Sequence, residues 1–216
     1  VVLSERMHKK VQPLVNVPVA LAMRYGSMTI EKGLQELNDK GVTEVLLFPL
    51  YPQYAMASTL TILVKAEEIR KKKFPQMKFT DVPAFYNKPD YIKNLADSIQ
   101  KHLSGFEYDR LLFSYHGIPE RHIRKTDVTK SHCKIDGSCC NTPSPAHEFC
   151  YRHQCYETTK QVMKLLDIPE EKHSLTFQSR LAGDKWLEPY TDIEIDKMPS
   201  KGIKNLAVVT PAFVSD

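Results

Sequence analysis

Short apolar runs alternate along this chain with longer stretches in which apolar residues recur at helical spacing. Residues 42–50 (VTEVLLFPL) form a nearly continuous apolar run, which predicts a buried strand of a parallel sheet. The helix predicted at 58–73 has Ser58 as its N-cap. Its apolar face is made of Leu60, Leu63, Val64 and Ile69. The same reasoning predicts strands at 77–82, 110–115, 175–178 and 205–209, and helices from about Met28 and at 90–103 and 150–166.

This alternation predicts an α/β fold, in which helices cover both faces of parallel sheets. Ser104 and Gly105 end a predicted helix, so we expect two domains at 1–104 and 105–216. Ligands of such sheets bind beyond the carboxyl ends of the strands. Residues 51–54, His116 and 211–216 follow predicted strands, and we expect them to converge on one cleft.

Composition excludes a few classes of function. Lys and Arg exceed Asp and Glu by 30 to 26, a mild basic excess that does not indicate nucleic-acid binding. No apolar run approaches the length of a bilayer span, and the 8 glycines form no phosphate-binding loop. The chain opens on Val1 without a signal peptide, and we expect its natural start to lie upstream.

Five cysteines occupy one short stretch with the spacing C-x5-C-C-x9-C-x4-C. An odd number without a secretory segment argues against a disulfide framework and favours a reducing cytoplasm. Residues 118–148, which hold three of the cysteines, are predicted to be a long irregular loop with a functional role. Thiols gathered there could hold tetrahedral zinc or an iron–sulfur cluster, or could be free. Cys155 lies within a helical pattern and is predicted to pack.

His116 ends a predicted strand, where Gly117 allows the chain to turn sharply. An imidazole in that place can bind a metal or accept a proton near neutral pH, or it can simply hydrogen-bond to the adjoining loop. The other histidines of this region fall in a charged loop, and most of them are predicted to be solvated. They are His122, His132, His147 and His153.

Three further positions each allow a functional and a structural interpretation. Arg24, beside Tyr25, could hold a carboxylate of a ligand, but a structural ion pair with Asp or Glu is favoured. The aromatic residues at 50–54 suit either a pocket wall or the core. Trp186, near Pro189 and Tyr190, suits a flat aromatic ligand as well as it suits packing.

Four segments, taken together, resemble the ferrochelatases, lyases that insert ferrous iron into a porphyrin. LLFSYHGIPERHIRKTD resembles the family's segment around its active-site histidine, here His116. LLFPLYPQYAMAST resembles the segment on the opposite side of the porphyrin site, and TFQSRLAGDKWLEPYTD resembles the later stretch near the pocket. VVTPAFVSD resembles the approach to a helix whose acidic residue partners the histidine. The segments follow the family's order over nearly the whole chain.

The resemblance implies two similar Rossmann-like lobes, incomplete at both ends, with a porphyrin in the cleft between them. It implies iron insertion into protoporphyrin IX or coproporphyrin III in heme biosynthesis, with Fe²⁺ as substrate and His116 as the base or iron ligand. The chain alone is expected to be inactive, because the acidic partner is expected just after Asp216. Oligomeric state and peripheral membrane contact stay open. The porphyrin is expected to contact Arg24, Tyr25, Tyr51, Tyr54, Gln178, Ser179 and Trp186.

The cysteine-rich segment at 131–150 is similar to the internal iron–sulfur segment of a subset of bacterial ferrochelatases. It implies a two-iron, two-sulfur cluster, with zinc as the alternative. The expected ligands are Cys133, Cys139, Cys140 and Cys150. Two other functions stay open: a chelatase for another tetrapyrrole or metal, and a cysteine-rich zinc or redox module on an α/β scaffold. The first is disfavoured because those relatives tend to carry a metal-binding histidine where this chain has residues 51–54.

Overall fold

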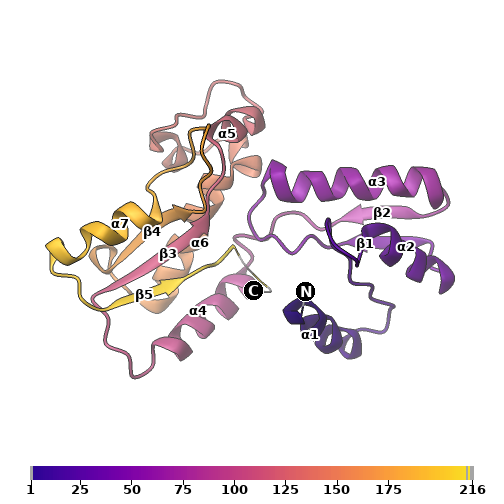
Figure 1. Cartoon of the computed structure of the whole chain (residues 1–216), viewed down its shortest axis with the longest axis horizontal. Helices are drawn as coiled ribbons and strands as arrows, with labels where there is room; N and C mark the ends of the chain where they lie inside the picture. Colours follow the sequence, from indigo (N-terminus) through magenta and orange to yellow (C-terminus); the bar gives the residue numbers. More distant parts are fainter. Residues whose placement is uncertain (1, 213, 215–216) are drawn as a thin grey trace. The chain divides into compact units, whose positions relative to one another are not determined.

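A computed structural model describes residues 2–212 and 214. The described chain divides into two compact units. The N-terminal unit holds residues 2–51, 56–83 and 214, and the C-terminal unit holds Pro52–Ala55 and Ala84–Ala212. Figure 1 labels the elements of both units. Each unit contains its own parallel sheet, so the predicted α/β class is confirmed.

The N-terminal unit is built on a two-stranded parallel sheet, β1 (Glu44–Leu47) and β2 (Lys78–Asp81), with Val45 opposite Phe79. Its helices are α1 (Val2–Val11), α2 (Ile30–Asp39) and α3 (Thr61–Lys73), with a 3-10 turn at Gln12–Leu14. Thr29 precedes α2 and is its N-cap, because the Thr29 hydroxyl accepts a hydrogen bond from the Lys32 N–H. The core consists of Ile30, Leu34, Leu37, Val45, Ala66, Phe74 and Met77.

The start of α3 differs from the prediction. A π-helical turn, Met56–Leu60, runs directly into α3, so Ser58 is not an N-cap. The predicted apolar face is only partly right: Ile69 packs against the core, but Val64 is 49% exposed and Ala66, which was not predicted, is fully buried. Apolar residues lie on more than one side of this helix, so their spacing does not identify a single buried face. The residue of α3 that is buried in the core is the small Ala66.

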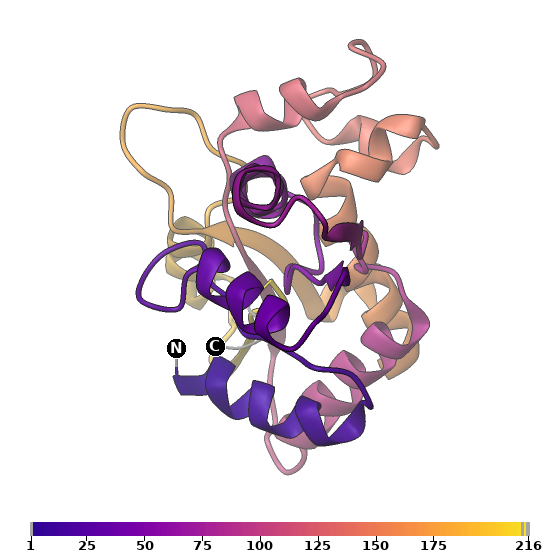
Figure 2. The same ribbon diagram turned by 90° about the vertical axis from the view of Figure 1, so that its right-hand side faces the viewer.

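The C-terminal unit is built on a three-stranded parallel sheet with the order β4-β3-β5. Its strands are β3 (Arg110–His116), β4 (His173–Gln178) and β5 (Leu206–Val209). Alternate β3 side chains, including Phe113 and Tyr115, share one core with α4 (Pro89–Leu103) and α6 (Tyr151–Leu166). The two helices contact each other and lie side by side, pink and orange, in Figure 2. Ser114 of β3 and Thr176 of β4 instead contact α7 (Thr191–Lys197), where both hydroxyls are hydrogen-bonded to the Thr191 hydroxyl.

Shorter elements fill the connections of this unit. Helix α5 (Glu120–Thr126) interrupts the stretch predicted to be irregular, and α7 was not predicted. Both are 7 residues long, too short for a clear helical period to stand out in the sequence. Turns of 3-10 helix lie at Ser138–Asn141, Pro145–Phe149, Glu170–Lys172 and Pro199–Lys201. Among the described residues, no helix is both long enough and apolar enough to cross a bilayer.

The division of the chain by contacts differs from the predicted boundary after Ser104. Helix α4 belongs to the C-terminal unit, whose main segment begins at Ala84. The same unit also includes Pro52–Ala55. The buried face of α4, formed by Ile92, Ala96 and Ile99, packs into the core of β3 and α6. Ser104 and Gly105 are a turn within one unit, because α4 has no other core to cover.

Helix α6 offers a matched test of this core. Met163 is 4% exposed, whereas Leu165, two residues later, is 58% exposed. We expect Met163→Ala to lower the free energy of unfolding by about 2–5 kcal/mol, because it leaves a cavity in the core. Leu165→Ala should change it by less than about 0.5 kcal/mol. Urea unfolding measures both, and equal midpoints for the two variants would contradict the described core.

Candidate active site

His116 is the last residue of β3, the central strand of its sheet. Two hydrogen bonds fix the backbone around it: the Tyr151 hydroxyl donates to the His116 carbonyl at 2.8 Å, and the Gly117 N–H donates to the Gln178 carbonyl at 2.8 Å. The side chain is exposed, yet nearby protein atoms desolvate the ring enough to lower the pKa of His116. The imidazole is therefore neutral at pH 7 and able to accept a proton or bind a metal ion.

Gly117 sets how closely the neighbouring segments approach His116. A Cβ atom at this position would lie 2.9 Å from the Gln178 carbonyl oxygen and 3.4 Å from Cε3 of Trp186. The chain directly after Trp186 is held in place because the Leu187 N–H donates to the Ile118 carbonyl at 3.0 Å. Only a residue without a side chain fits here, so Gly117 brings Gln178 and Trp186 to the side of the catalytic candidate.

Three of the predicted pocket residues thus lie at this end of the sheet. The Gln178 amide donates to the Ser114 carbonyl at 3.4 Å, and Ser179 adopts a left-handed conformation with φ of 67°. Trp186 is 9% exposed, and its buried indole N–H has no hydrogen-bond partner among the described residues. Trp186, which packs against Gly117, thus carries a buried donor that no described residue satisfies.

Tyr54 belongs to the same unit and packs against the segment around α6. Its N–H donates to the Gln154 side chain at 2.6 Å, and its ring meets Phe149 edge-on at 5.1 Å between centroids. Burial raises the pKa of the Tyr54 hydroxyl. The preceding Gln53 is buried and donates to Thr158 at 3.0 Å, so this stretch is anchored by polar contacts rather than by apolar packing alone.

Arg24, Tyr25 and Tyr51 belong to the N-terminal unit. The favoured ion pair of Arg24 is not found: in the described part of the chain, no carboxylate pairs with it, and its guanidinium lies 5.0 Å from the centre of the Tyr25 ring. Tyr25 is 78% exposed. Stacking on an exposed ring leaves the guanidinium able to bind an added carboxylate. The predicted convergence of residues 51–54, His116 and 211–216 stays a prediction, and Phe213, Ser215 and Asp216 lie outside the described residues.

The five cysteines are free, and four of them form two pairs. Cys140 donates a hydrogen bond to Cys150, which lowers the pKa of Cys150 and raises that of Cys140. Burial and the nearby Cys139 raise the pKa of Cys133 to about 12. In the described part of the chain, no three His, Cys, Asp or Glu side chains are arranged to hold a single metal ion. Cys155 is fully buried within α6, beside Tyr151.

Arg152, in the first turn of α6, holds the cysteine-rich segment. Its buried guanidinium donates to the carbonyls of Ile135 and Lys134, the latter at 2.5 Å. The Lys134 N–H in turn donates to the Cys139 sulfur at 3.2 Å. The two terminal nitrogens of this buried cation are bonded by loop carbonyls, which fixes the shape of the segment, because breaking these bonds leaves a charge without solvent or partner.

The prediction of solvated loop histidines is wrong, because all four side chains are partly buried. His132, His147 and His153 are half-buried, and the rings of the last two stack with centroids 3.5 Å apart. The side chains fold back onto the loop because its carbonyls offer them hydrogen-bond partners. His122, on α5, is also partly buried, and desolvation lowers its pKa.

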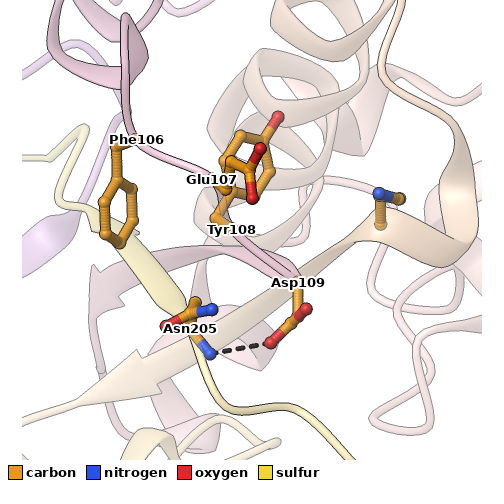
Figure 3. Close-up of a pocket in the computed structure, with 6 residues that line it drawn as sticks. Phe106, Glu107, Tyr108, Asp109 and Asn205 are labelled. Carbon is orange, nitrogen blue, oxygen red and sulfur yellow. Dashed lines mark hydrogen bonds between the residues drawn. The ribbon is translucent and has the colours of Figure 1, made fainter.

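A pocket of about 440 Å³ lies at the other end of the same sheet. Figure 3 shows the residues that line it. It lies where β3 and β5 begin, and its Asp109 carboxylate accepts a hydrogen bond from the Asn205 N–H at 2.8 Å. Its lining is formed by Phe106, Glu107, Tyr108, Asp109, Lys172 and Asn205. Since ligands of parallel sheets bind at the carboxyl ends of the strands, the opposite end, at His116, is the stronger candidate.

Comparison with known proteins shows the family of the chain. The ferrochelatase family model matches residues 2–216. The chain is 45% identical over 199 residues to a ferrochelatase of Opitutus terrae, covering 92% of this chain and 57% of that protein. It is 41% identical over 217 residues to a ferrochelatase of Pseudomonas syringae pv. tomato and 42% identical over 219 residues to one of Ectopseudomonas mendocina. Both alignments cover 100% of this chain and 64% of the relative. The chain thus spans 57% to 64% of the length of these relatives.

The close approach at Gly117 is testable with the single tryptophan of the chain. We expect Gly117→Ala to lower the free energy of unfolding by about 1–3 kcal/mol, because the added methyl overlaps a backbone carbonyl and crowds the indole. Trp186 emission should shift to longer wavelength as the ring is pushed outward. Gly105→Ala is the control for the emission alone, because its added Cβ would meet nothing within 4 Å and should leave Trp186 emission unchanged. Its φ of 77° makes alanine strained there, so this variant loses stability as well. Unchanged Trp186 emission in Gly117→Ala would contradict the contact.

Proposed function

Since the chain belongs to the ferrochelatase family, we propose that it inserts Fe²⁺ into a porphyrin in heme biosynthesis. Protoporphyrin IX and coproporphyrin III are the candidate substrates. The observation that carries the proposal is His116, an exposed imidazole with a lowered pKa at the carboxyl end of the central strand, beside Gln178 and Trp186.

The chemistry of iron insertion requires what His116 offers. Two pyrrole protons leave the porphyrin as the metal enters, so the site needs a base that is unprotonated at the working pH. A neutral imidazole can accept such a proton, and it is also a good ligand for Fe²⁺. The backbone bonds from Tyr151 and Gly117 hold the strand end from which the ring projects, which limits the reorganisation needed during the reaction.

The proposed porphyrin contacts divide by chemistry. Trp186 and Tyr54 offer aromatic surface, while Gln178 and Ser179 offer polar groups beside His116. From the N-terminal unit, we propose that Tyr25 and Tyr51 add aromatic surface. Arg24 would bind a propionate of the porphyrin, a role supported by its having no carboxylate partner among the described residues.

We also propose that Cys133, Cys139, Cys140 and Cys150 hold a two-iron, two-sulfur cluster. Such a cluster takes four thiolates, two on each iron. The pairing of Cys140 with Cys150, and the proximity of Cys139 to Cys133, support this donor set. Zinc would need its four ligands around one centre. The bound cluster would tie the segment together, since iron insertion itself requires no electron.

A cytoplasmic location is proposed as well. All five cysteines are free, including the neighbouring thiols of Cys140 and Cys150. A reducing compartment keeps adjacent thiols in this state.

The role of His116 is tested by His116→Ala in the full-length protein. We expect the rate of iron insertion to fall by about 10²–10⁴-fold, the usual contribution of a positioned base. In the unmodified protein, kcat/KM should fall as the pH drops through the lowered pKa of His116, below the usual histidine value of about 6.5, because the imidazolium can neither accept a proton nor bind iron.

His102→Ala serves as the control, because His102 is exposed on α4 and hydrogen-bonds only within its own helix. Porphyrin absorbance measures turnover, and circular dichroism checks folding. Near-normal turnover by folded His116→Ala would remove His116 from the mechanism.

The cluster is tested by replacing each cysteine with serine and purifying the variants without oxygen. Loss of any one of the four proposed ligands should abolish the visible absorption and lower the content of iron and acid-labile sulfide. Cys155→Ser should retain both, because Cys155 is buried within α6 and is satisfied by contacts to that helix. If Cys155→Ser is bleached while any of the other four keeps its colour, the assignment is wrong.

A further inference from the structure

Three polar atoms of the cysteine-rich segment form a small triangle that neither proposed site uses. The Nε2 atoms of His132 and His147 lie 3.4 Å apart. The Cys139 carbonyl oxygen lies 3.1 Å from the first and 3.3 Å from the second. All three are electron-pair donors to a cation, although they come from positions up to 15 residues apart.

The size of this triangle matches one face of a tetrahedral metal site. A tetrahedral ion with Zn–N bonds of about 2.0–2.1 Å holds its ligand atoms about 3.3–3.4 Å apart. Imidazole nitrogen is a preferred ligand of zinc, copper, nickel and ferrous iron. In the described part of the chain, no third His, Cys, Asp or Glu side chain completes the set, so water would fill the remaining position.

Contacts around the triangle hold the two rings in place. The His132 N–H donates to the Thr129 hydroxyl at 3.0 Å. The His147 ring stacks on His153, with an angle of 11° between the ring planes, and His153 is itself bound to the Cys140 carbonyl at 2.9 Å. Both rings are half-buried, which restricts their rotation. Ligands held in this way lose little freedom when a metal binds.

We propose that His132, His147 and the Cys139 carbonyl form a binding site for one divalent transition-metal ion of the zinc class. The site is distinct from His116 and from the cysteine sulfurs, and it uses the backbone of Cys139 rather than its thiol. Two imidazoles, one carbonyl and water make an exchangeable site rather than a closed structural one. A bound ion would cross-link the segments on either side of Cys139 and so stabilise the whole loop.

The test is a Co²⁺ titration of the full-length, cluster-loaded protein in a His116→Ala background, so that the proposed catalytic histidine adds no signal. Spectra are recorded as differences against the cobalt-free protein, which removes the absorption of the cluster. One equivalent should give the visible bands of imidazole-bound cobalt without the near-ultraviolet absorption of a cobalt–thiolate bond. His132→Gln and His147→Gln should each weaken binding at least about tenfold, because even the loss of an outer partner of a metal ligand costs that much. His102→Gln should leave the affinity unchanged.

A second measurement does not depend on how well the variants fold. Pulsed electron paramagnetic resonance of the Cu²⁺-loaded His116→Ala protein should detect two imidazole nitrogens on the copper. Thiolate coordination, fewer than two imidazoles, or unchanged cobalt affinity in His132→Gln would each overturn the proposal and leave the three atoms as hydrogen-bond partners of one another.

Discussion

The structure of the C-terminal unit depends on the buried polar face of one helix, α6. A polar side chain inside a core must be hydrogen-bonded, since each unsatisfied group costs about 1–3 kcal/mol. In α6 this requirement is met by partners outside the helix. The Gln154 side chain accepts a hydrogen bond from the Tyr54 N–H, and the Thr158 hydroxyl donates to the Tyr86 carbonyl. The Thr159 hydroxyl is hydrogen-bonded to the buried Tyr115 hydroxyl of β3. Apolar packing tolerates small shifts of a helix, but these directional bonds do not.

The first turn of α6 extends the same constraint to both candidate sites. Cys150 contributes a thiol to the cysteine pairs, Tyr151 bonds the backbone of His116, and Arg152 bonds the carbonyls of the cysteine-rich segment. Three consecutive residues therefore tie the strand end that presents the imidazole to the loop that presents the thiols. Cys150 is the extended residue that precedes the helix, and Tyr151 and Arg152 begin its first turn, so the three side chains point in different directions and can serve two neighbours.

Much of this arrangement could be predicted from the sequence. The five strands follow from short apolar runs, and His116 was identified because it ends such a run before a glycine. The apolar face of α4 was also predicted well, since Ile92, Ala96 and Ile99 recur on a single side. The prediction was only partly right for α3, where apolar residues occur on several sides and only packing decides which of them is buried.

Contacts between side chains that are far apart in the sequence could not be predicted from local patterns. Nothing in the local sequence distinguishes the half-buried His147 from the exposed His102, because their burial depends on where a loop folds back. The ion pair favoured for Arg24 is not found among the described residues, where its guanidinium lies over the Tyr25 ring instead.

The sequence by itself thus determined the fold class, the strands, the family resemblance and the position of the central histidine. These depend on local periodicity and on short motifs, which can be recognised in the sequence without knowledge of the tertiary contacts. Only the tertiary structure decided that α4 joins the second unit, that Gly117 brings Trp186 to His116, and that four thiols form pairs. Those features arise from contacts between residues far apart in the chain, and their geometry is set by close packing and by the need of buried polar groups for partners.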